Sequence, residues 1–332
     1  MSWDRRQRWS GLLVTIGACV AVLIIVQVWI GIVHDLVLRS PIRLGQFAES
    51  TVGQAPPEGD APETPHIYRS SYRTAKKVVA FSVFGNRTID ADGAVWNARS
   101  MPFAYAGWKV RFYVDSTVPV GTLDRIRTTG AEIRRVPPQM ETWREARRMF
   151  RFMALVDDDV DYVMFRDTDS YVSMREITAA NEWLMTNRTF HVMRDHQFHT
   201  THILAGMWGA YAPVLRQRMQ PSTVYDSMRD YVTPMIDGYM KRDVDQDYLS
   251  EFVWKHAVGD VVEHDAFNCP GSQPYVDQPR PFPLPRDESA DFVGNIRRLD
   301  FSATSNYVIH GGWQFRNRTP VACRRDPQYI WG

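Results

Sequence analysis

The sequence has little cysteine and almost no net charge, and these two shortages exclude several classes of protein. Its 332 residues include three cysteines, too few for a disulfide framework. Cys19 lies in an apolar stretch, which leaves Cys269 and Cys323 either bridged in an oxidising compartment or as two free thiols. The formal net charge is +1, so the chain lacks the strong field that would hold nucleic acid. We therefore expect no nucleic-acid partner.

A third absence is local, because residues 11–33 contain no charged side chain. As a helix this run is long enough to cross about 30 Å of hydrocarbon. A cleaved signal peptide is the alternative, but its apolar region would be shorter, about 7 to 15 residues. Arg5, Arg6 and Arg8 precede the run, which predicts a cytoplasmic N-terminus. We expect a tail over residues 1–10 and a transmembrane signal anchor over residues 11–33, with the remainder beyond the membrane.

The segment after the predicted anchor is poor in apolar residues. Residues 34–75 include the proline-rich run APPEGDAPETP, which cannot bury enough apolar surface to order itself into a packed unit. We expect a stem there and one folded domain over residues 76–332. Glycosylation sequons at Asn86, Asn187 and Asn317 agree with a secretory location.

From residue 77 onward, apolar runs of strand length alternate with stretches of helical period. This alternation predicts a parallel sheet covered by helices, whose ligands gather beyond the carboxyl ends of the strands. The predicted strands cover residues 78–84, 110–114, 132–136 and 162–166, with helices over 90–105, 119–129 and 141–156 between them. Beyond Ser170 we expect a helix over 174–186, a strand over 190–193 and an apolar run over 205–211.

Two aspartates follow the fourth predicted strand directly, as Asp167-Thr168-Asp169. Side chains one residue apart at a strand end can both face one cation. A hard divalent ion on oxygen ligands, Mn²⁺ or Mg²⁺, would neutralise the charge that develops on a nucleoside diphosphate leaving group. The plain alternative is a capped or solvated acidic turn. The position after the fourth strand favours a metal site, with Asp167 and Asp169 as ligands.

Three segments in this order, FRDTDS, LAGMWGA and DQDYL, resemble GT-A-fold glycosyltransferases, and family 8 and neighbouring retaining families in particular. The resemblance runs from about Val78 to the C-terminus. It implies an α/β fold with a GT-A-like, Rossmann-type mixed sheet flanked by helices. It also implies transfer of a sugar, with retention of configuration, from a nucleotide-sugar donor to a glycan or glycoprotein acceptor.

Site residues follow from the resemblance by position. It implies Asp167, Asp169 and His310 as metal ligands, although the Lys-Pro-Trp that follows the family's histidine is absent here. It implies Asp245, Gln246 and Asp247 at the sugar ring, where the alternative is a helix N-cap. Ala205 and Gly206 would let the backbone approach the donor, or else serve strand packing.

Further donor contacts are expected from the residues themselves. Phe81 and Val83 end the first strand, where the nucleotide base would lie, although core packing is the alternative. Arg151 precedes the motif strand and could bind a diphosphate bidentately, or else lie on a solvated helix face. Asp195 and His196 precede the small-residue segment and could contact sugar hydroxyls.

The predicted orientation also bears on location. Nucleotide sugars are available in the Golgi lumen and are not expected in a bacterial periplasm, which favours a single-pass type II protein of the Golgi membrane with a lumenal catalytic domain. Two alternatives stay open. A metal-dependent nucleotidyltransferase or phosphoesterase would also need paired aspartates at strand ends. A catalytically inactive, anchored binding protein would need neither aspartate.

Overall fold

The computed structural model describes residues 72, 74–220, 223–268, 278–286, 292–296 and 319–328. The chain divides into two compact units, residues 1–63 and 64–332, and all the described residues belong to the second. Among these residues, no helix combines the length and apolar character needed to cross a bilayer. The predicted tail and anchor, and nearly all of the predicted stem, lie outside the described residues and stay predictions.

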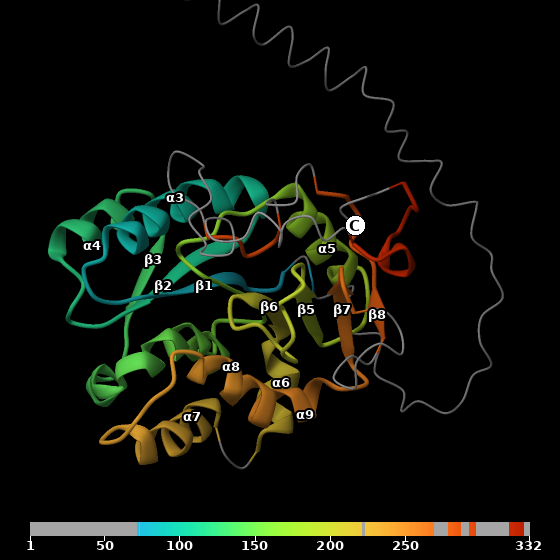
Figure 1. Ribbon diagram of the computed structural model, residues 1–332. Coiled ribbons are helices and arrows are strands. Elements are labelled where there is room, and N and C mark those ends of the chain that lie inside the picture. Colours follow the sequence, from blue (N-terminus) through green and yellow to red (C-terminus); the bar gives the residue numbers. More distant parts are fainter. Residues whose placement is uncertain are drawn as a thin grey trace, which may run out of the picture. The chain divides into compact units, whose positions relative to one another are not determined.

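A mixed eight-stranded sheet forms the centre of the described domain (Figure 1). Its strand order is β3-β2-β1-β4-β6-β5-β7-β8, and every neighbouring pair is parallel except the two that involve β6. The strands are β1 (Lys77–Val83), β2 (Lys109–Val114), β3 (Glu132–Arg135), β4 (Tyr162–Arg166), β5 (Phe190–Arg194), β6 (Met207–Tyr211), β7 (Val261–Asp265) and β8 (Pro279–Arg280). The predicted mixed α/β sheet flanked by helices is confirmed.

Helices cover both faces of this sheet, with α3, α4 and α5 on one face and α6 to α9 on the other (Figure 1). They are α3 (Thr88–Ala104), α4 (Val120–Arg127), α5 (Met174–Leu184), α6 (Ala212–Arg218), α7 (Val224–Val232), α8 (Val244–Tyr248) and α9 (Trp254–Ala257). Short 3₁₀ and π segments complete the order: η1 (Pro138–Thr142), η2 (Arg144–Leu155), η3 (Thr233–Met235), η4 (Leu249–Val253) and η6 (Val321–Cys323).

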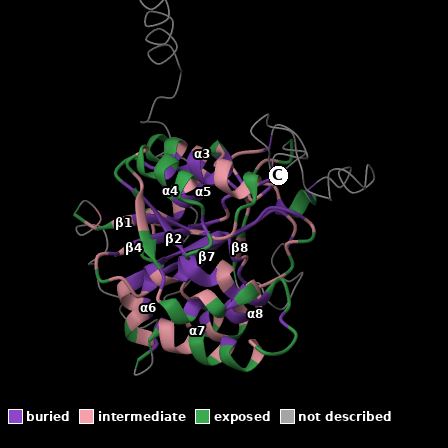
Figure 2. Cartoon of the chain, turned by 90° about the vertical axis from the view of Figure 1, so that its left-hand side faces the viewer, coloured by how far each residue is buried: buried purple, intermediate pink, exposed green. Residues whose placement is uncertain are grey.

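The two larger apolar cores lie between these layers, and β1 supplies side chains to both. Val79 and Phe81 pack with the α3 and α4 face, whereas Val78 and Ala80 pack with the opposite face. This is the two-residue period of a strand buried on both sides, which explains why the run reads as continuously apolar. Buried residues accordingly concentrate in the strands and on the inner sides of the helices (Figure 2).

The helix predicted over residues 141–156 is wound more tightly than an α-helix, as the 3₁₀ segments η1 and η2. A 3₁₀-helix has three residues per turn, so residues three apart lie above one another. Ala146, Met149, Phe152 and Leu155 follow this spacing, and all four are buried. The apolar period of the sequence therefore matches the tighter winding, and the segment packs its buried line against the sheet.

Candidate functional site

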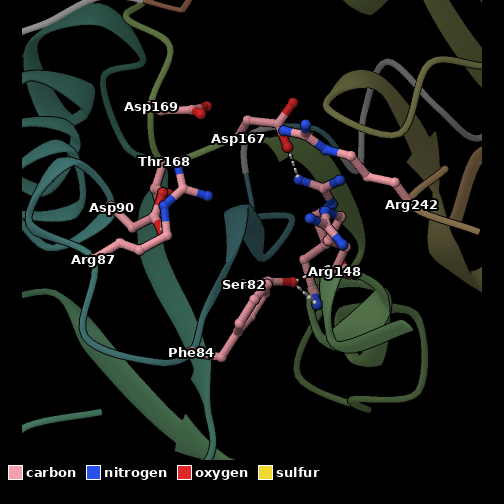
Figure 3. Close-up of a pocket in the computed structure, with 10 residues that line it drawn as sticks. Ser82, Phe84, Arg87, Asp90, Arg148, Asp167, Thr168, Asp169 and Arg242 are labelled. Carbon is pink, nitrogen blue, oxygen red and sulfur yellow. Dashed lines mark hydrogen bonds and ion pairs between the residues drawn. The ribbon is translucent and has the colours of Figure 1, made fainter. Parts of the chain in front are cut away.

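The acidic turn that follows β4 lies at the carboxyl end of three adjacent parallel strands, β2, β1 and β4. There it borders a solvent-open cavity. The cavity is lined by Ser82, Phe84, Arg87, Asp90, Arg148, Arg151, Asp167, Thr168, Asp169 and Arg242. Figure 3 shows Asp167 and Asp169 extending into this space, with Arg87 and Asp90 on one wall and Arg148 and Arg242 on another.

Helix α3 fixes the acidic turn from one side. A β-carbon added at Gly93 would lie 2.0 Å from the carbonyl oxygen of Thr168, so only glycine permits this approach. The buried amide of Asn97 then donates to the carbonyl oxygens of Thr168, at 3.0 Å, and Ser170, at 3.2 Å. These contacts satisfy backbone oxygens that the turn would otherwise leave buried without partners. The carboxylates project from a rigid support.

Gly206 fixes the turn from a second side. A β-carbon at this position would lie 2.0 Å from Oδ2 of Asp167, so the carboxylate occupies the space that any side chain would need. Gly206 was predicted to admit the donor sugar, and its glycine character is explained here by the closeness of Asp167. Ala205 is 5% exposed and belongs to the apolar core, which agrees with the alternative role in strand packing.

Arg151 connects the two acidic motifs. Its side chain is 3% exposed, and its guanidinium binds Oδ1 of Asp167 and, at 3.1 Å, Oδ2 of Asp245. A third bond runs to the carbonyl oxygen of Arg166 at 3.0 Å. The hydroxyl of Ser82 accepts from the backbone N–H of Arg151 at 2.9 Å and so holds η2 against the end of β1. Arg151 is thus inside the site, as predicted, and its described contacts are with protein carboxylates.

The carboxylates of the site differ in their affinity for a proton. Burial, together with the charges of Asp167 and Asp90, raises the pKa of Asp169 to about 7. Burial would also raise the pKa of Asp167, but the charge and hydrogen bond of Arg151 outweigh it and hold that pKa below its usual value. Burial raises the pKa of Asp245 to about 6, despite the opposing charge of Arg151. Asp169 is therefore the carboxylate that would gain most from a cation.

Asp167 and Asp169 fit a metal ion that takes only part of its coordination sphere from the protein. Among the described residues, no three histidine, cysteine, aspartate or glutamate side chains converge on one point. Two hard oxygen donors beside an open cavity suit an ion that keeps waters and shares phosphate oxygens of a substrate, as Mg²⁺ and Mn²⁺ do. The predicted third ligand, His310, lies outside the described residues.

The Asp-Gln-Asp segment begins α8, and its three side chains have different surroundings. Asp245 is 4% exposed and is held by Arg151. Asp247 is partly exposed and pairs with Lys241 at 3.1 Å. Gln246 is half-buried. Asp245 does not cap the helix through its side chain, since the N-cap residue is Asp243 and makes no side-chain cap bond. The structure brings Asp245 to the acidic turn and leaves Gln246 and Asp247 off the cavity wall.

The predicted base-binding residues of β1 lie in the core. Phe81 is 0% exposed and stacks on Phe112 with ring centroids 5.1 Å apart, and Val83 is 3% exposed. Their strand neighbours Ser82 and Phe84 line the cavity instead. The correction follows from the two-residue period of the strand, which turns alternate side chains to opposite faces.

Asp195 and His196 also lie away from the cavity. Asp195 is 0% exposed and accepts two bonds of 2.8 Å from Arg175 and one of 2.9 Å from the backbone N–H of Val293. His196 is 5% exposed and packs its ring on Phe292 at 4.6 Å. Their described contacts are structural, because they attach residues 292–296 to the end of β5.

Four residues of the cavity were missed from the sequence: Ser82, Arg87, Asp90 and Arg242. Arg87 and Asp90 lie at the start of α3, directly after β1, where the position beyond a strand end was a usable signal. Arg242 belongs to the connection between η3 and α8. It carries no strand or helix signal and reaches the cavity only through the tertiary fold.

Comparison with known proteins finds likeness only among solved structures, since no family model and no curated protein matches the sequence. A galactosyltransferase solved with donor and acceptor sugar analogues is 13% identical, with a TM-score of 0.36, over 58% of this chain and 75% of that one. Glucosyl-3-phosphoglycerate synthase from Mycobacterium tuberculosis, solved with Mn²⁺, uridine diphosphate and phosphoglyceric acid, is 12% identical, with a TM-score of 0.32.

The match to the synthase covers 49% of this chain and 63% of that protein, which is less than two thirds of its length. The same synthase with Mn²⁺ and uridine-diphosphate-glucose gives 11% identity and a TM-score of 0.33. Likeness at these values carries no argument about the chemistry of this chain.

Proposed function

We propose that this chain is a metal-dependent glycosyltransferase, which moves a hexosyl or pentosyl unit from a nucleotide-sugar donor to a glycan or glycoprotein acceptor. The observation that carries the proposal is the placement of Asp167 and Asp169 in one cavity at the carboxyl ends of β1, β2 and β4. In open α/β sheets this edge is where nucleotide ligands bind. The raised pKa of Asp169 marks a carboxylate without enough positive charge around it.

The roles of the residues follow from their contacts. Asp169, with Asp167, would hold Mn²⁺ or Mg²⁺, and the ion would act as a Lewis acid on the departing diphosphate. Arg151 keeps Asp167 ionised and oriented, and it places Asp245 at the same end of the sheet. Retention of configuration is the outcome we favour. An inverting displacement needs a carboxylate that acts as general base, whereas the carboxylates that line the cavity gather at the proposed ion site.

The proposed location is the Golgi membrane, with the chain as a single-pass type II protein and its catalytic domain in the lumen. Support comes from the uncharged run over residues 11–33 and the arginines that precede it. Fusing a glycosylation reporter to the C-terminus tests the orientation. A reporter that stays unglycosylated in cells would contradict a lumenal domain.

A screen of nucleotide sugars with added Mn²⁺, scored by release of free nucleoside diphosphate, tests the activity. Release of a nucleoside diphosphate from one donor, abolished by a chelator, is the expected result. Release of inorganic phosphate or pyrophosphate instead would favour the nucleotidyltransferase or phosphoesterase. Donor binding that survives Asp169→Asn, with no turnover in either protein, would favour an inactive binding protein.

A further inference from the structure

The connection between η3 and α8 brings one arginine, Arg242, into the cavity, where its charge acts on Glu145. Arg242 is exposed and lines the cavity together with Asp167 and Asp169. Figure 3 shows it reaching toward Asp167 from the opposite wall. Within the described part of the chain, Arg242 makes no hydrogen bond and no ion pair.

The backbone around Arg242 is fixed. The guanidinium of Arg144 donates to the carbonyl oxygens of Ile236, at 3.3 Å, and Gly238, at 2.9 Å. Met240 is 6% exposed, and its sulfur accepts from the backbone N–H of Ala146 at 3.3 Å. Val244, which begins α8, is 1% exposed. The chain is therefore held on both sides of Arg242, so this side chain is presented to the cavity by a supported backbone.

Arg144 itself is in an unusual conformation. Its φ is 48°, the one positive value among the described residues other than glycine. A side chain held in that region costs free energy and persists where surrounding contacts over-determine it. Here the contacts are the two carbonyl oxygens of the Arg242 connection. The positive φ of Arg144 therefore coincides with the bonds that hold this segment in place.

The other arginines of the cavity already have carboxylate partners. Arg151 binds Asp167 and Asp245, and Arg148 binds Glu145. Arg87 pairs with Asp90 at 3.4 Å. Four arginines and three aspartates line the cavity, with Asp245 beside Arg151 and Glu145 beside Arg148. A divalent ion would make this set of charges positive overall, which favours a negatively charged ligand such as a sugar linked through a diphosphate.

From these contacts we infer that Arg242 binds the diphosphate of the donor and selects sugars linked through a diphosphate over sugars linked through a monophosphate. The inference rests on the proposed function. A guanidinium presents a planar set of N–H donors that matches phosphate oxygens bidentately. Beside Asp167 in the cavity, Arg242 would contact the phosphate oxygens of the donor. Arg242 is a specificity-determining residue in this scheme.

Inorganic pyrophosphate is a probe that needs no knowledge of the base or the sugar. Its affinity for the full chain is measured by calorimetry with excess Mn²⁺, beside that of inorganic phosphate. Arg242→Gln is expected to weaken pyrophosphate binding by about tenfold or more, because hydrogen bonds to charged groups are the strong ones, and to leave phosphate binding nearly unchanged. Arg242→Lys should recover part of the loss.

The matched control is Arg127→Gln on α4, which removes the same charge from a side chain that is 54% exposed and pairs with Asp124. It should bind pyrophosphate as the parent chain does. Equal affinities in Arg242→Gln and Arg127→Gln would overturn the inference, as would an equal loss for phosphate and pyrophosphate, or no pyrophosphate binding by the parent.

The proposed function can fail separately. A chain that binds pyrophosphate through Arg242, yet releases no nucleoside diphosphate from any nucleotide sugar, keeps the anion site and loses the transferase. An active transferase whose Arg242→Gln variant binds pyrophosphate normally keeps its function and loses this inference.

Discussion

At the scale of single residues, Asp169 is the side chain on which the proposed chemistry most depends. Its carboxylate lies among few cations, beside the negative charges of Asp167 and Asp90, so the folded protein holds it in an unfavourable setting. A residue of this kind is expected to serve function at the expense of stability. Activity and stability should therefore respond in opposite directions to its replacement.

Replacing Asp169 by asparagine should lower turnover at least about a hundredfold, because Lewis-acid stabilisation of a leaving group is worth several kcal/mol. Removing the repelling charge should leave the melting temperature unchanged or raised. Turnover assays with Mn²⁺ and thermal unfolding check both parts. Asp124→Asn, at a side chain that is 61% exposed on α4, is the control for loss of a carboxylate. Full activity in Asp169→Asn would contradict the metal site.

Gly206 offers a second prediction at this scale. Gly206→Ala would place its new methyl group 2.0 Å from Oδ2 of Asp167, so the carboxylate that Arg151 binds would have to shift. Overpacking of this kind costs about 1 to 3 kcal/mol, and metal affinity should fall with it. Chemical unfolding and Mn²⁺ titration measure the two effects.

Gly121→Ala is the matched control, because a β-carbon there meets no atom within 4 Å and the residue lies in α4. A helical alanine should stabilise the protein by about 0.5 to 1 kcal/mol relative to glycine. Two glycine substitutions with effects of opposite sign would support close contact at Gly206. A loss of stability in both would contradict it.

At the scale of elements, the sequence predicts the strands and helices up to β4 within a few residues, since their apolar periods are clear. The short-range pattern does not show how strongly the tertiary fold fixes η2. Arg151 lies on this segment and was expected either to bind the donor or to face solvent. The structure places its guanidinium between Asp167 and Asp245. Such a bridge joins residues far apart in the chain, and no local periodicity reports it.

The same reasoning explains which site residues could be predicted. Asp167 and Asp169 follow a strand directly, so the topology rule for α/β sheets is enough to place them. The prediction for Phe81 was wrong because hydrophobicity alone does not indicate which face of the sheet a strand side chain points to. Arg242 was not predicted because its position depends on Arg144 and Met240, which hold the connection between η3 and α8 in place.

The bridge made by Arg151 gives a prediction for the packing of η2, β4 and α8. Arg151→Met should destabilise the fold by about 3 kcal/mol, because removing one partner leaves buried carboxylates without compensation. Adding Asp245→Asn should restore part of that stability. Urea unfolding of both single variants and the double variant completes the cycle. Strictly additive losses would show that the two side chains do not interact.

At the scale of the whole molecule, a chain of polar contacts joins the core to residues 319–328. His191 contacts His264 at 2.9 Å, and His264 contacts Glu182 at 2.9 Å. Glu182 also accepts bonds of 2.6 and 2.9 Å from Arg325. Cys323, in the same segment, takes part in a disulfide whose partner lies outside the described residues. The non-covalent contacts attach this segment, through Glu182 and His264, to α5 and the sheet.

Glu182 makes the stability of this attachment dependent on pH. Burial opposes its ionisation, but its hydrogen bonds with His264 and Arg325 prevail and lower its pKa to about 2. Because the folded pKa lies below the unfolded value, the ionised group stabilises the fold fully above about pH 4.5. The contribution decreases as pH falls from there toward 2.

Glu182→Gln should therefore destabilise the protein by on the order of 2 kcal/mol at pH 7 and by much less near pH 3. Melting temperatures of the parent and the variant at pH 7, 4 and 3 measure the difference. A gap between them that stays constant with pH would contradict the contribution from ionised Glu182.

The antiparallel direction of β6 has a consequence for how the protein acquires its site during synthesis. Because β6 runs antiparallel to β4, its first residues lie beside the acidic turn that follows β4. Gly206 can therefore contact Asp167 only after β6 has been synthesised. Arg151 likewise gains its contact with Asp245 only when α8 has been synthesised. A nascent chain that ends before β6 would contain the whole Asp-Thr-Asp turn and its support from α3, yet lack the contacts with Gly206 and Asp245. Capture of the ion should thus report completed folding of the domain rather than the mere presence of its ligands.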